Sequence, residues 1–303
     1  VYFPCTKKIG SNISFGFLIN LNLEKIVKEN NLDVLNVHSG PGGIFLWKHP
    51  GIKLVVTAHH TYSQQTKYLK HQCWKNFFIP FEKKTYRLAD QIISVSETTK
   101  RILIEKYKIS ADKVKVIPNC IDLNKFKYLS GVEKIPNSLL YIGRLDERKG
   151  IDWLIKSMPQ VVEEISNIKL FVGGKGKLFK WCKKFIKKNN LEKNIEMLGF
   201  VPDNKLNEWY NKAKIVIIPS KFEGFGITAL EALATKTNII AIKSDGLNCV
   251  LKKYPDFLIE RNVNLLISKI KGLLKSPKEI DYKYVKGFRC EKVVNQTEKI
   301  YSK

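Results

Sequence analysis

The sequence lacks the marks of several protein classes. No stretch approaches the roughly eighteen uninterrupted apolar residues of a membrane-spanning helix, so we do not expect one. None of the six cysteines belongs to a Cys-x-x-Cys pair, which argues against a structural zinc site and a disulfide framework. No internal repeat of solenoid period is visible. We therefore expect a globular protein with reduced thiols, located in the cytoplasm.

Acidic residues are scarce relative to basic ones. The 303 residues include 53 Lys and Arg but only 28 Asp and Glu, which gives a formal net charge of +25. Such a charge suits nucleic acid, an anionic membrane or an acidic substrate. Because lysines occur along the whole chain, a general compositional bias is the favoured explanation. No RNA-binding motif accompanies the charge, and we predict no nucleic-acid partner.

One local excess of charge stands out. Residues 169–188 contain eight lysines and no acid, and residues 178–188 interleave apolar and basic positions at helical spacing. The simplest interpretation is a packed helix with a solvated face. The alternative is peripheral contact with an anionic membrane, at the inner face.

Apolar runs of strand length alternate with helix-like segments. In the first half we expect strands at 32–37, 52–57, 91–95 and 114–117, and helical segments at 22–30, 44–48, 62–88 and 97–107. The long segment 62–88 is expected to break near Pro80. Alternation of this kind predicts parallel βαβ units in a doubly wound α/β sheet.

The polar, irregular segment 125–137 is the expected linker between two domains. Beyond it we expect strands at 138–142, 168–172, 195–198, 214–218 and 238–242, helices at 151–165, 178–188, 205–212 and 227–234, and a terminal amphipathic helix at 289–301. The predicted divisions are a first domain at 1–127, a second at 128–285, and a terminal segment at 286–303.

The stretch 219–234, PSKFEGFGITALEALA, combines a strand end, a glycine loop and a helix. Gly224 and Gly226 allow a tight turn, and the Ala- and Leu-rich residues that follow favour a helix. A helix N-terminus offers free N–H groups to an anion. With Glu223 and Glu231 eight positions apart, the stretch predicts a ligand that carries both phosphate and hydroxyl groups.

Glu223 and Glu231 form an E-x7-E pattern, and the segment 143–150 begins with Gly-Arg and ends with Lys-Gly. The segments 94–96, 118–122 and 198–202 complete a set of five motifs. In kind and order this set resembles the retaining nucleotide-sugar glycosyltransferases of family 4. The resemblance implies the GT-B fold, in which two Rossmann-like domains face a cleft. It also implies that the terminal helix packs back toward the first domain.

The resemblance implies a role for each motif. The donor diphosphate would bind Arg144, Lys149 and the backbone at Phe225, Gly226 and Ile227. The ribose would bind Glu231, and the base would bind Gly199, Phe200 and Val201. His59 and Glu223 would be the catalytic residues beside the donor sugar. The residue types suit these roles, because two fixed cations can stabilise a departing diphosphate.

The sequence contains no Asp-x-Asp pair, the signature with which sugar transferases of the other main fold hold a divalent ion. The resemblance implies a hexosyltransferase, and the missing pair leads us to expect that it needs no metal and no cofactor. Its partners would be a nucleoside-diphosphate sugar and an acceptor of unknown identity, which could be a glycan, a lipid or a small molecule.

The sequence departs from the family in three places. The residues after Val1 already resemble a later strand of the family, so we expect its first strand-and-helix unit to be missing, either by truncation or by natural loss. Cys120 stands where glycine is usual, and 236–238 replaces a Gly-x-Pro. Two alternatives therefore remain: a catalytically impaired donor-binding remnant, and another enzyme on this scaffold, such as a sugar phosphorylase or an epimerase.

Overall fold

The computed structural model describes residues 11–40 and 43–302, and the chain divides into two compact units. Unit 1 comprises Val1–Asn119 together with Glu291–Lys303, and unit 2 comprises Cys120–Cys290. Unit 2 thus begins at 120, where the sequence predicts 128, and ends at 290, where it predicts 285. The strand-like character expected for the first residues lies outside the described residues.

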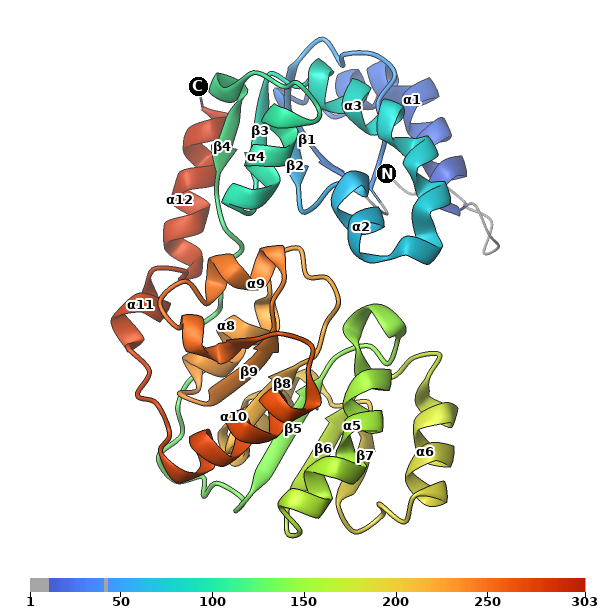
Figure 1. Ribbon diagram of the computed structural model, residues 1–303. Coiled ribbons are helices and arrows are strands. Elements are labelled where there is room, and N and C mark those ends of the chain that lie inside the picture. Colours follow the sequence, from blue (N-terminus) through green and yellow to red (C-terminus); the bar gives the residue numbers. More distant parts are fainter. Residues whose placement is uncertain (1–10, 41–42, 303) are drawn as a thin grey trace. The chain divides into compact units, whose positions relative to one another are not determined.

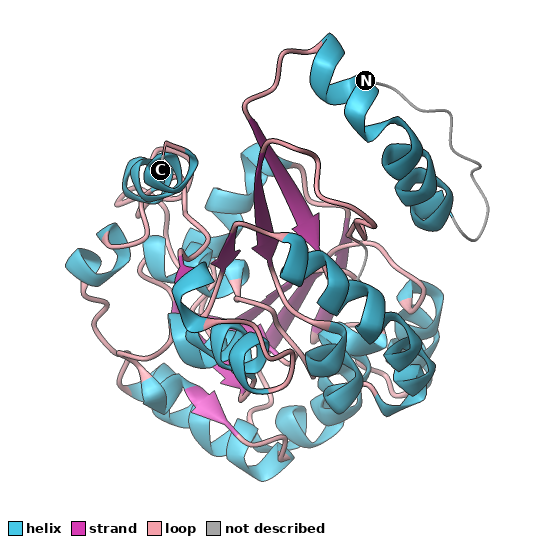
Figure 2. Cartoon of the chain, turned by 90° about the horizontal axis from the view of Figure 1, so that it is seen from above, coloured by secondary structure: helices cyan, strands magenta, loops and turns pink. Residues whose placement is uncertain are grey.

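Unit 1 contains a parallel sheet in the order β1-β2-β3-β4 (Figure 1). Its strands are β1 (Val34–Ser39), β2 (Lys53–Ala58), β3 (Gln91–Ser94) and β4 (Val114–Val116). Its helices are α1 (Ser11–Glu29), α2 (Tyr62–Tyr68), α3 (Ile79–Leu88), α4 (Glu97–Glu105) and α12 (Cys290–Tyr301), with 3-10 turns η1 (Lys70–Phe78) and η2 (Ala111–Lys113). Helices flank the strands, as Figure 2 shows by colour.

The two faces of this sheet carry separate apolar clusters, because successive strand residues point to opposite sides. Val56 and Ile92 belong to the cluster that takes in residues of α1, α3 and α4. Val55 and Ile93 face the other way, where residues of α12 pack against them. The last helix of the chain therefore completes the second core of unit 1.

Unit 2 contains a parallel sheet in the order β10-β9-β8-β5-β6-β7. Its strands are β5 (Ser138–Ile142), β6 (Lys169–Gly173), β7 (Ile195–Gly199), β8 (Ile215–Ile218), β9 (Asn238–Ile242) and β10 (Leu258–Ile259). Its helices are α5 (Ile151–Glu164), α6 (Phe179–Lys188), α7 (Asp203–Lys212), α8 (Ile227–Ala234), α9 (Asp245–Val250), α10 (Val263–Lys275) and α11 (Tyr282–Lys286), with 3-10 turns η3 (Glu147–Lys149) and η4 (Pro255–Phe257). The elements between β9 and α12 have no counterpart among the predicted ones.

One local prediction in unit 1 is wrong, and another is incomplete. The segment 44–48 is not a helix, because distant side chains take its backbone donors: Leu46 N–H donates to Thr85 Oγ1 at 2.9 Å, and Trp47 N–H to Asn20 Oδ1 at 2.8 Å. The segment 62–88 does change near Pro80, because η1 ends at Phe78 and α3 begins at Ile79, with Pro80 in its first turn, where its missing N–H costs nothing. A further break, which the sequence does not predict, falls at Leu69, between α2 and η1.

Candidate active site

Two loops of unit 2 meet at the carboxyl ends of β5 and β8, which are neighbours in the sheet. Gly150 ends the loop after β5 with φ +71°, and a Cβ there would lie 1.9 Å from the Pro219 carbonyl oxygen. Only glycine fits that approach. The Lys221 N–H also donates to the Arg148 carbonyl at 2.9 Å. The two motifs that the sequence singles out are therefore in direct contact.

Glu223 lies at the centre of this contact. Its side chain is buried, and Oε1 accepts hydrogen bonds of 2.7 Å from both Lys149 Nζ and Ser220 Oγ. Arg148 Nη1 lies 4.0 Å from Oε2 and donates to the Phe222 carbonyl at 3.3 Å. Two cations thus surround one buried carboxylate, an arrangement in which each group holds the others in place. Arg148 and Ser220 are missed by the sequence analysis, although both are neighbours of predicted site residues.

Arg144 does not join this cluster. Its side chain is 70% exposed, and Nε lies 3.6 Å from Asp146 Oδ2. Asp146 in turn caps η3, since its Oδ1 accepts from the Lys149 N–H at 2.9 Å. Asp146 therefore fixes the loop backbone and leaves the Arg144 guanidinium presented to solvent, where an anion can reach it.

Glu231 occupies a different environment from Glu223. It lies on α8, and its Oε2 accepts a 2.6 Å hydrogen bond from the hydroxyl of Tyr210, a fully buried residue of α7. Burial raises the pKa of Glu231, while the Tyr210 hydrogen bond and the positive charges of Lys125 and Lys149 oppose that rise. Tyr210 lies in no recognisable motif, so the sequence contains no signal for its role.

The N-terminus of α8 lies next to Glu223 along the chain. Gly226 caps the helix with φ +103°, and in the described part of the chain this end has no side-chain cap hydrogen bond. Phe225 is buried, and its ring centroid lies 6.2 Å from that of Phe288, which follows α11. The Ile227 side chain is half exposed. The predicted diphosphate residues at this turn therefore contribute backbone donors and a positive dipole end.

The predicted base-binding residues lie at the end of β7. Gly199 has φ +68°, and its carbonyl accepts from Gly174 N–H at 2.6 Å. Val201 is buried, whereas the Phe200 ring is 62% exposed, with Lys175 Nζ 5.0 Å from its centroid. Phe200 thus presents an aromatic face on which a planar group can stack.

The glycine loop 173–176 has a structural role. A Cβ on Gly174 would lie 1.8 Å from the Gly143 carbonyl oxygen, and one on Gly176 would lie 2.4 Å from the Leu145 carbonyl oxygen. The loop packs against the segment after β5 and braces it. This contact explains its glycines without a ligand.

In unit 1, His59 follows β2 and forms a pair with His38 at the end of β1. His38 Nδ1 and His59 Nε2 are 2.8 Å apart, and the rings stack with centroids 5.0 Å apart. One nitrogen must donate and the other accept. Burial, and secondarily the charge of His38, lowers the pKa of His59. One hydrogen bond therefore joins the two rings, and the lowered pKa favours the neutral form of His59.

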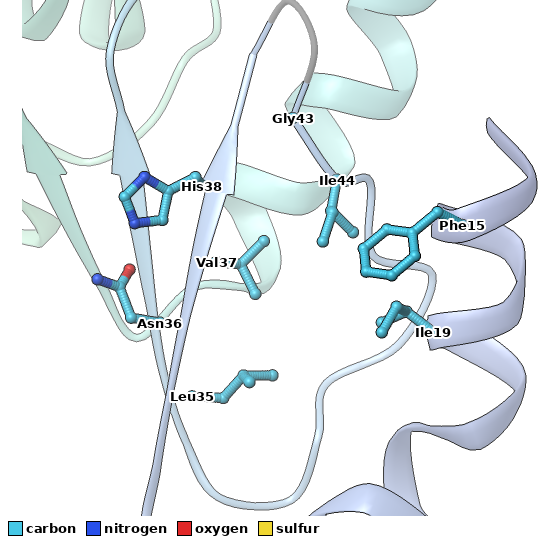
Figure 3. Close-up of a pocket in the computed structure, with 8 residues that line it drawn as sticks. All are labelled: Phe15, Ile19, Leu35, Asn36, Val37, His38, Gly43 and Ile44. Carbon is cyan, nitrogen blue, oxygen red and sulfur yellow. The ribbon is translucent and has the colours of Figure 1, made fainter. Parts of the chain in front are cut away.

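A pocket of about 410 Å³ adjoins this pair in unit 1 (Figure 3). Phe15 and Ile19 of α1 and Val37 of β1 contribute apolar side chains to its lining. His38 also borders the pocket, but Figure 3 shows its ring on the side of β1 away from Phe15 and Ile44.

Glu82, which the sequence analysis misses, holds the loop that carries His59 in place through hydrogen bonds. Both carboxyl oxygens of this fully buried residue accept from the Tyr62 N–H, at 3.1 and 3.2 Å, and the Tyr107 hydroxyl donates to Oε2. Burial raises the pKa of Glu82 to about 8. This buried carboxyl thus holds the start of α2, three residues beyond His59.

Sequence profiles match both halves of the chain. The profile described as Glycosyl transferases group 1 matches residues 125–286, and that described as Glycosyltransferase Family 4 matches residues 4–125. The first of these covers more than half of the chain. The chain belongs to the group 1 glycosyltransferases. The family assignment that the motifs predict is confirmed.

Curated relatives of this glycosyltransferase cover it to different extents. One uncharacterized glycosyltransferase of Methanocaldococcus jannaschii is 34% identical over 54% of this chain and 44% of its own length. A second from the same organism is 29% identical over 92% of this chain and 77% of its own length. A UDP-Gal:alpha-D-GlcNAc-diphosphoundecaprenol alpha-1,3-galactosyltransferase of Escherichia coli is 24% identical over 93% of this chain and 78% of its own length. The chain thus spans less than half of the first relative.

Solved structures establish the fold. A sucrose-phosphate synthase from Thermosynechococcus elongatus superposes with a TM-score of 0.80 at 19% identity, covering 100% of this chain and 80% of its own. HepE of Anabaena, solved with UDP and glucose, gives 0.71 at 18% identity, covering 98% and 84%. The fold of the glycosyltransferase is GT-B, as the motifs predict.

Proposed function

We propose that this glycosyltransferase moves a sugar from a nucleoside-diphosphate sugar to an acceptor, with retained anomeric configuration and without a metal ion. The observation that carries the proposal is the contact of Lys149 with Glu223 at the ends of β5 and β8. It places a cation, a carboxylate and the N-terminus of α8 in one site, which suits a ligand with a diphosphate and hydroxyl groups. The UDP named for HepE and the UDP-Gal named for the Escherichia coli relative support this donor class.

The proposed roles follow from charge and exposure. Arg144 is free to reach the phosphates, and Lys149 exchanges its bond to Glu223 for a bond to the departing diphosphate. Preorganised donors of this kind contribute about 3–4 kcal/mol each to lowering a barrier. Backbone N–H groups from Phe225 to Ile227 bind the same group.

Glu223, freed from Lys149, faces the donor sugar, and Glu231 accepts from the ribose hydroxyls while Tyr210 orients it. Gly199, Phe200 and Val201 hold the base, with the Phe200 ring as a stacking surface. Unit 1 binds the acceptor and supplies His59, which acts as a catalytic residue beside the donor sugar. The acceptor class stays open among glycan, lipid and small molecule.

The metal-free mechanism is part of the proposal. Among the described residues, no group of three or more His, Cys, Asp and Glu could hold a metal ion. The proposal rests on the cations that the site supplies for the diphosphate instead. Transfer that persists in excess EDTA would support it, and transfer that stops and returns with Mg²⁺ would contradict it.

We place the reaction in the cytoplasm, with peripheral contact at the inner membrane face. Cys73, Cys120, Cys182 and Cys249 are free thiols. Within the described part of the chain, no helix has the length and apolarity needed to cross a membrane. Helix α6 carries the lysines that favour an anionic surface.

A panel of nucleotide sugars tests the proposal. Binding is measured by calorimetry, transfer or hydrolysis by nucleotide release, and the anomeric outcome by NMR. Retained configuration in the product supports the mechanism, and inversion contradicts it. Binding without transfer or hydrolysis would instead favour a donor-binding remnant, and turnover that requires inorganic phosphate would favour a phosphorylase. Glu231→Gln is expected to weaken nucleotide binding while the chain stays folded.

A further inference from the structure

Three large aromatic side chains are exposed next to each other in unit 1. Trp74 and Phe77 of η1 are 64% and 70% exposed, and Phe81 of α3 is 41% exposed. We call these three residues the aromatic patch. All nine residues of η1 are described, and none is buried. Scattered apolar residues on a surface are ordinary, but a contiguous apolar cluster marks an interaction site.

The patch rests on a fixed aromatic platform. The Phe77 ring lies 5.6 Å from the rings of both Phe78 and Phe81, and Trp74 lies 6.1 Å from Phe78. Phe78 stacks on Phe45 at 6.0 Å with an interplanar angle of 16°. The exposed rings are therefore held by half-buried ones, so the patch is part of the folded unit.

The surface around the patch is cationic. Residues 67–87 include six basic side chains and a single acid, Glu82. Glu82 is fully buried and hydrogen-bonded inside the unit, so it contributes no charge to the surface. Lys67, Lys70 and Lys84 are exposed, and Lys75 Nζ lies 5.7 Å from the Trp74 ring centroid. The exposed aromatic side chains are thus surrounded by positively charged ones.

Helix α6 of unit 2 is also cationic, but it differs from the aromatic patch in how far its apolar side chains are exposed. Its lysines are exposed, but Cys182 and Ile186 are buried, and Trp181 packs against Phe185 with ring centroids 5.4 Å apart. Helix α6 therefore offers charge to an anionic surface, whereas its aromatic side chains, Phe179, Trp181 and Phe185, are only partly exposed.

We propose that the aromatic patch is a docking surface for an anionic lipid bilayer. Trp74, Phe77 and Phe81 enter the interfacial layer, where aromatic rings partition favourably, and the surrounding lysines attract the lipid phosphates. Charge complementarity favours this occupant over a second copy of the chain, because two such cationic patches repel each other. The inference rests on the peripheral membrane contact of the proposed function and names the surface that makes it. Binding needs neither donor nor acceptor, so its failure would leave the proposed sugar transfer untouched.

Sedimentation of the full chain with vesicles tests the proposal, without nucleotide sugar. Vesicles of phosphatidylglycerol mixed with phosphatidylcholine are compared with vesicles of phosphatidylcholine alone. The chain is expected to bind the anionic vesicles, and Trp74→Ser/Phe77→Ser/Phe81→Ser is expected to lower the affinity about tenfold or more. Raised salt should remove the residual binding of the triple variant before that of the parent, because apolar insertion is not screened.

Two controls locate the effect. Leu21→Ser removes a side chain that is 63% exposed on α1, outside the patch, and should leave vesicle binding unchanged. Lys183→Glu/Lys187→Glu reverses charge on α6 and should lower binding less than the triple variant does. Thermal melting verifies folding, and Phe77→Ser alone serves if the triple variant melts early.

Three results would overturn the proposal. They are absence of binding to anionic vesicles, equal binding by the parent and a folded patch variant, and loss of binding only on charge reversal in α6. A dimer in gel filtration that the patch variant splits, without vesicle binding, would make the patch a self-association surface instead. None of these results bears on whether the enzyme transfers sugar.

Discussion

Lys149 and Glu223 stand 74 residues apart in the sequence and meet through a 2.7 Å ion pair. The pair joins the loop after β5 to the loop after β8, and Glu223 is almost inaccessible to solvent. A buried carboxylate needs its partners, because a charge left without them pays the full cost of desolvation. Lys149 thus serves both the fold and the proposed chemistry.

Lys149→Ala and Arg144→Ala should therefore have different consequences. Both are expected to cut turnover on the order of 10²- to 10³-fold, because each removes a cation from the proposed diphosphate site. Only Lys149→Ala should lower the free energy of unfolding, by about 1–3 kcal/mol, since the Arg144 side chain is 70% exposed. Denaturant unfolding and steady-state rates measure the two effects. Near-normal turnover in both variants would remove the diphosphate site from the proposal.

Gly150→Ala should disrupt the contact between the two loops. A Cβ at Gly150 would lie 1.9 Å from the Pro219 carbonyl oxygen, at a φ of +71° that side chains rarely adopt. We expect a loss of about 1–3 kcal/mol in unfolding free energy, together with weaker nucleotide binding. Gly131→Ala is the matched control, because a Cβ there would meet nothing within 4 Å. Equal stability of the two variants would show that the close approach is not required.

Glu82 should make stability depend on pH. Its folded-state pKa is about 8 against an ordinary value of 4.5, so between these values the folded chain holds a proton that the unfolded chain releases. Stability should then fall as pH rises from 4.5 to 8. Glu82→Gln stays neutral, so the gap between the melting temperatures of parent and variant should change across this window. Parallel melting curves against pH would mean that Glu82 is ionised in the folded state.

His38 should set the pH dependence of activity through the pKa of His59. Burial and the charge of His38 both lower the pKa of His59 below its ordinary 6.5, so we expect the neutral ring to be the active form. Activity should decline as pH falls through that pKa. His38→Ala removes the neighbouring charge and should move this acid limb to higher pH, whereas His38→Gln keeps a hydrogen-bonding partner. An acid limb that stays in place in His38→Ala would show that the pair does not control turnover.

Sequence patterns predict much of this site because parallel strands bring their carboxyl ends to one edge. The glycine loops, the strand ends and the helix after Gly226 follow from local propensity alone. The pairing of β5 with β8 does not, since neither motif specifies its neighbour. Tyr210 is missed because its role depends entirely on how α7 packs against α8. The segment 44–48 is mispredicted because Asn20 and Thr85, both remote in sequence, compete for its backbone donors.

The position of α12 has a consequence for the order in which the chain acquires its structure. Val293 and Ile300 cover the sheet face of Val55 and Ile93, yet the ribosome makes them only after the whole of unit 2. Domains fold largely in the order of their synthesis, so unit 2 can complete its core while that face of unit 1 still awaits its helix. A nascent chain stalled before Cys290 should therefore expose an apolar sheet surface, which is the kind of surface that chaperones recognise.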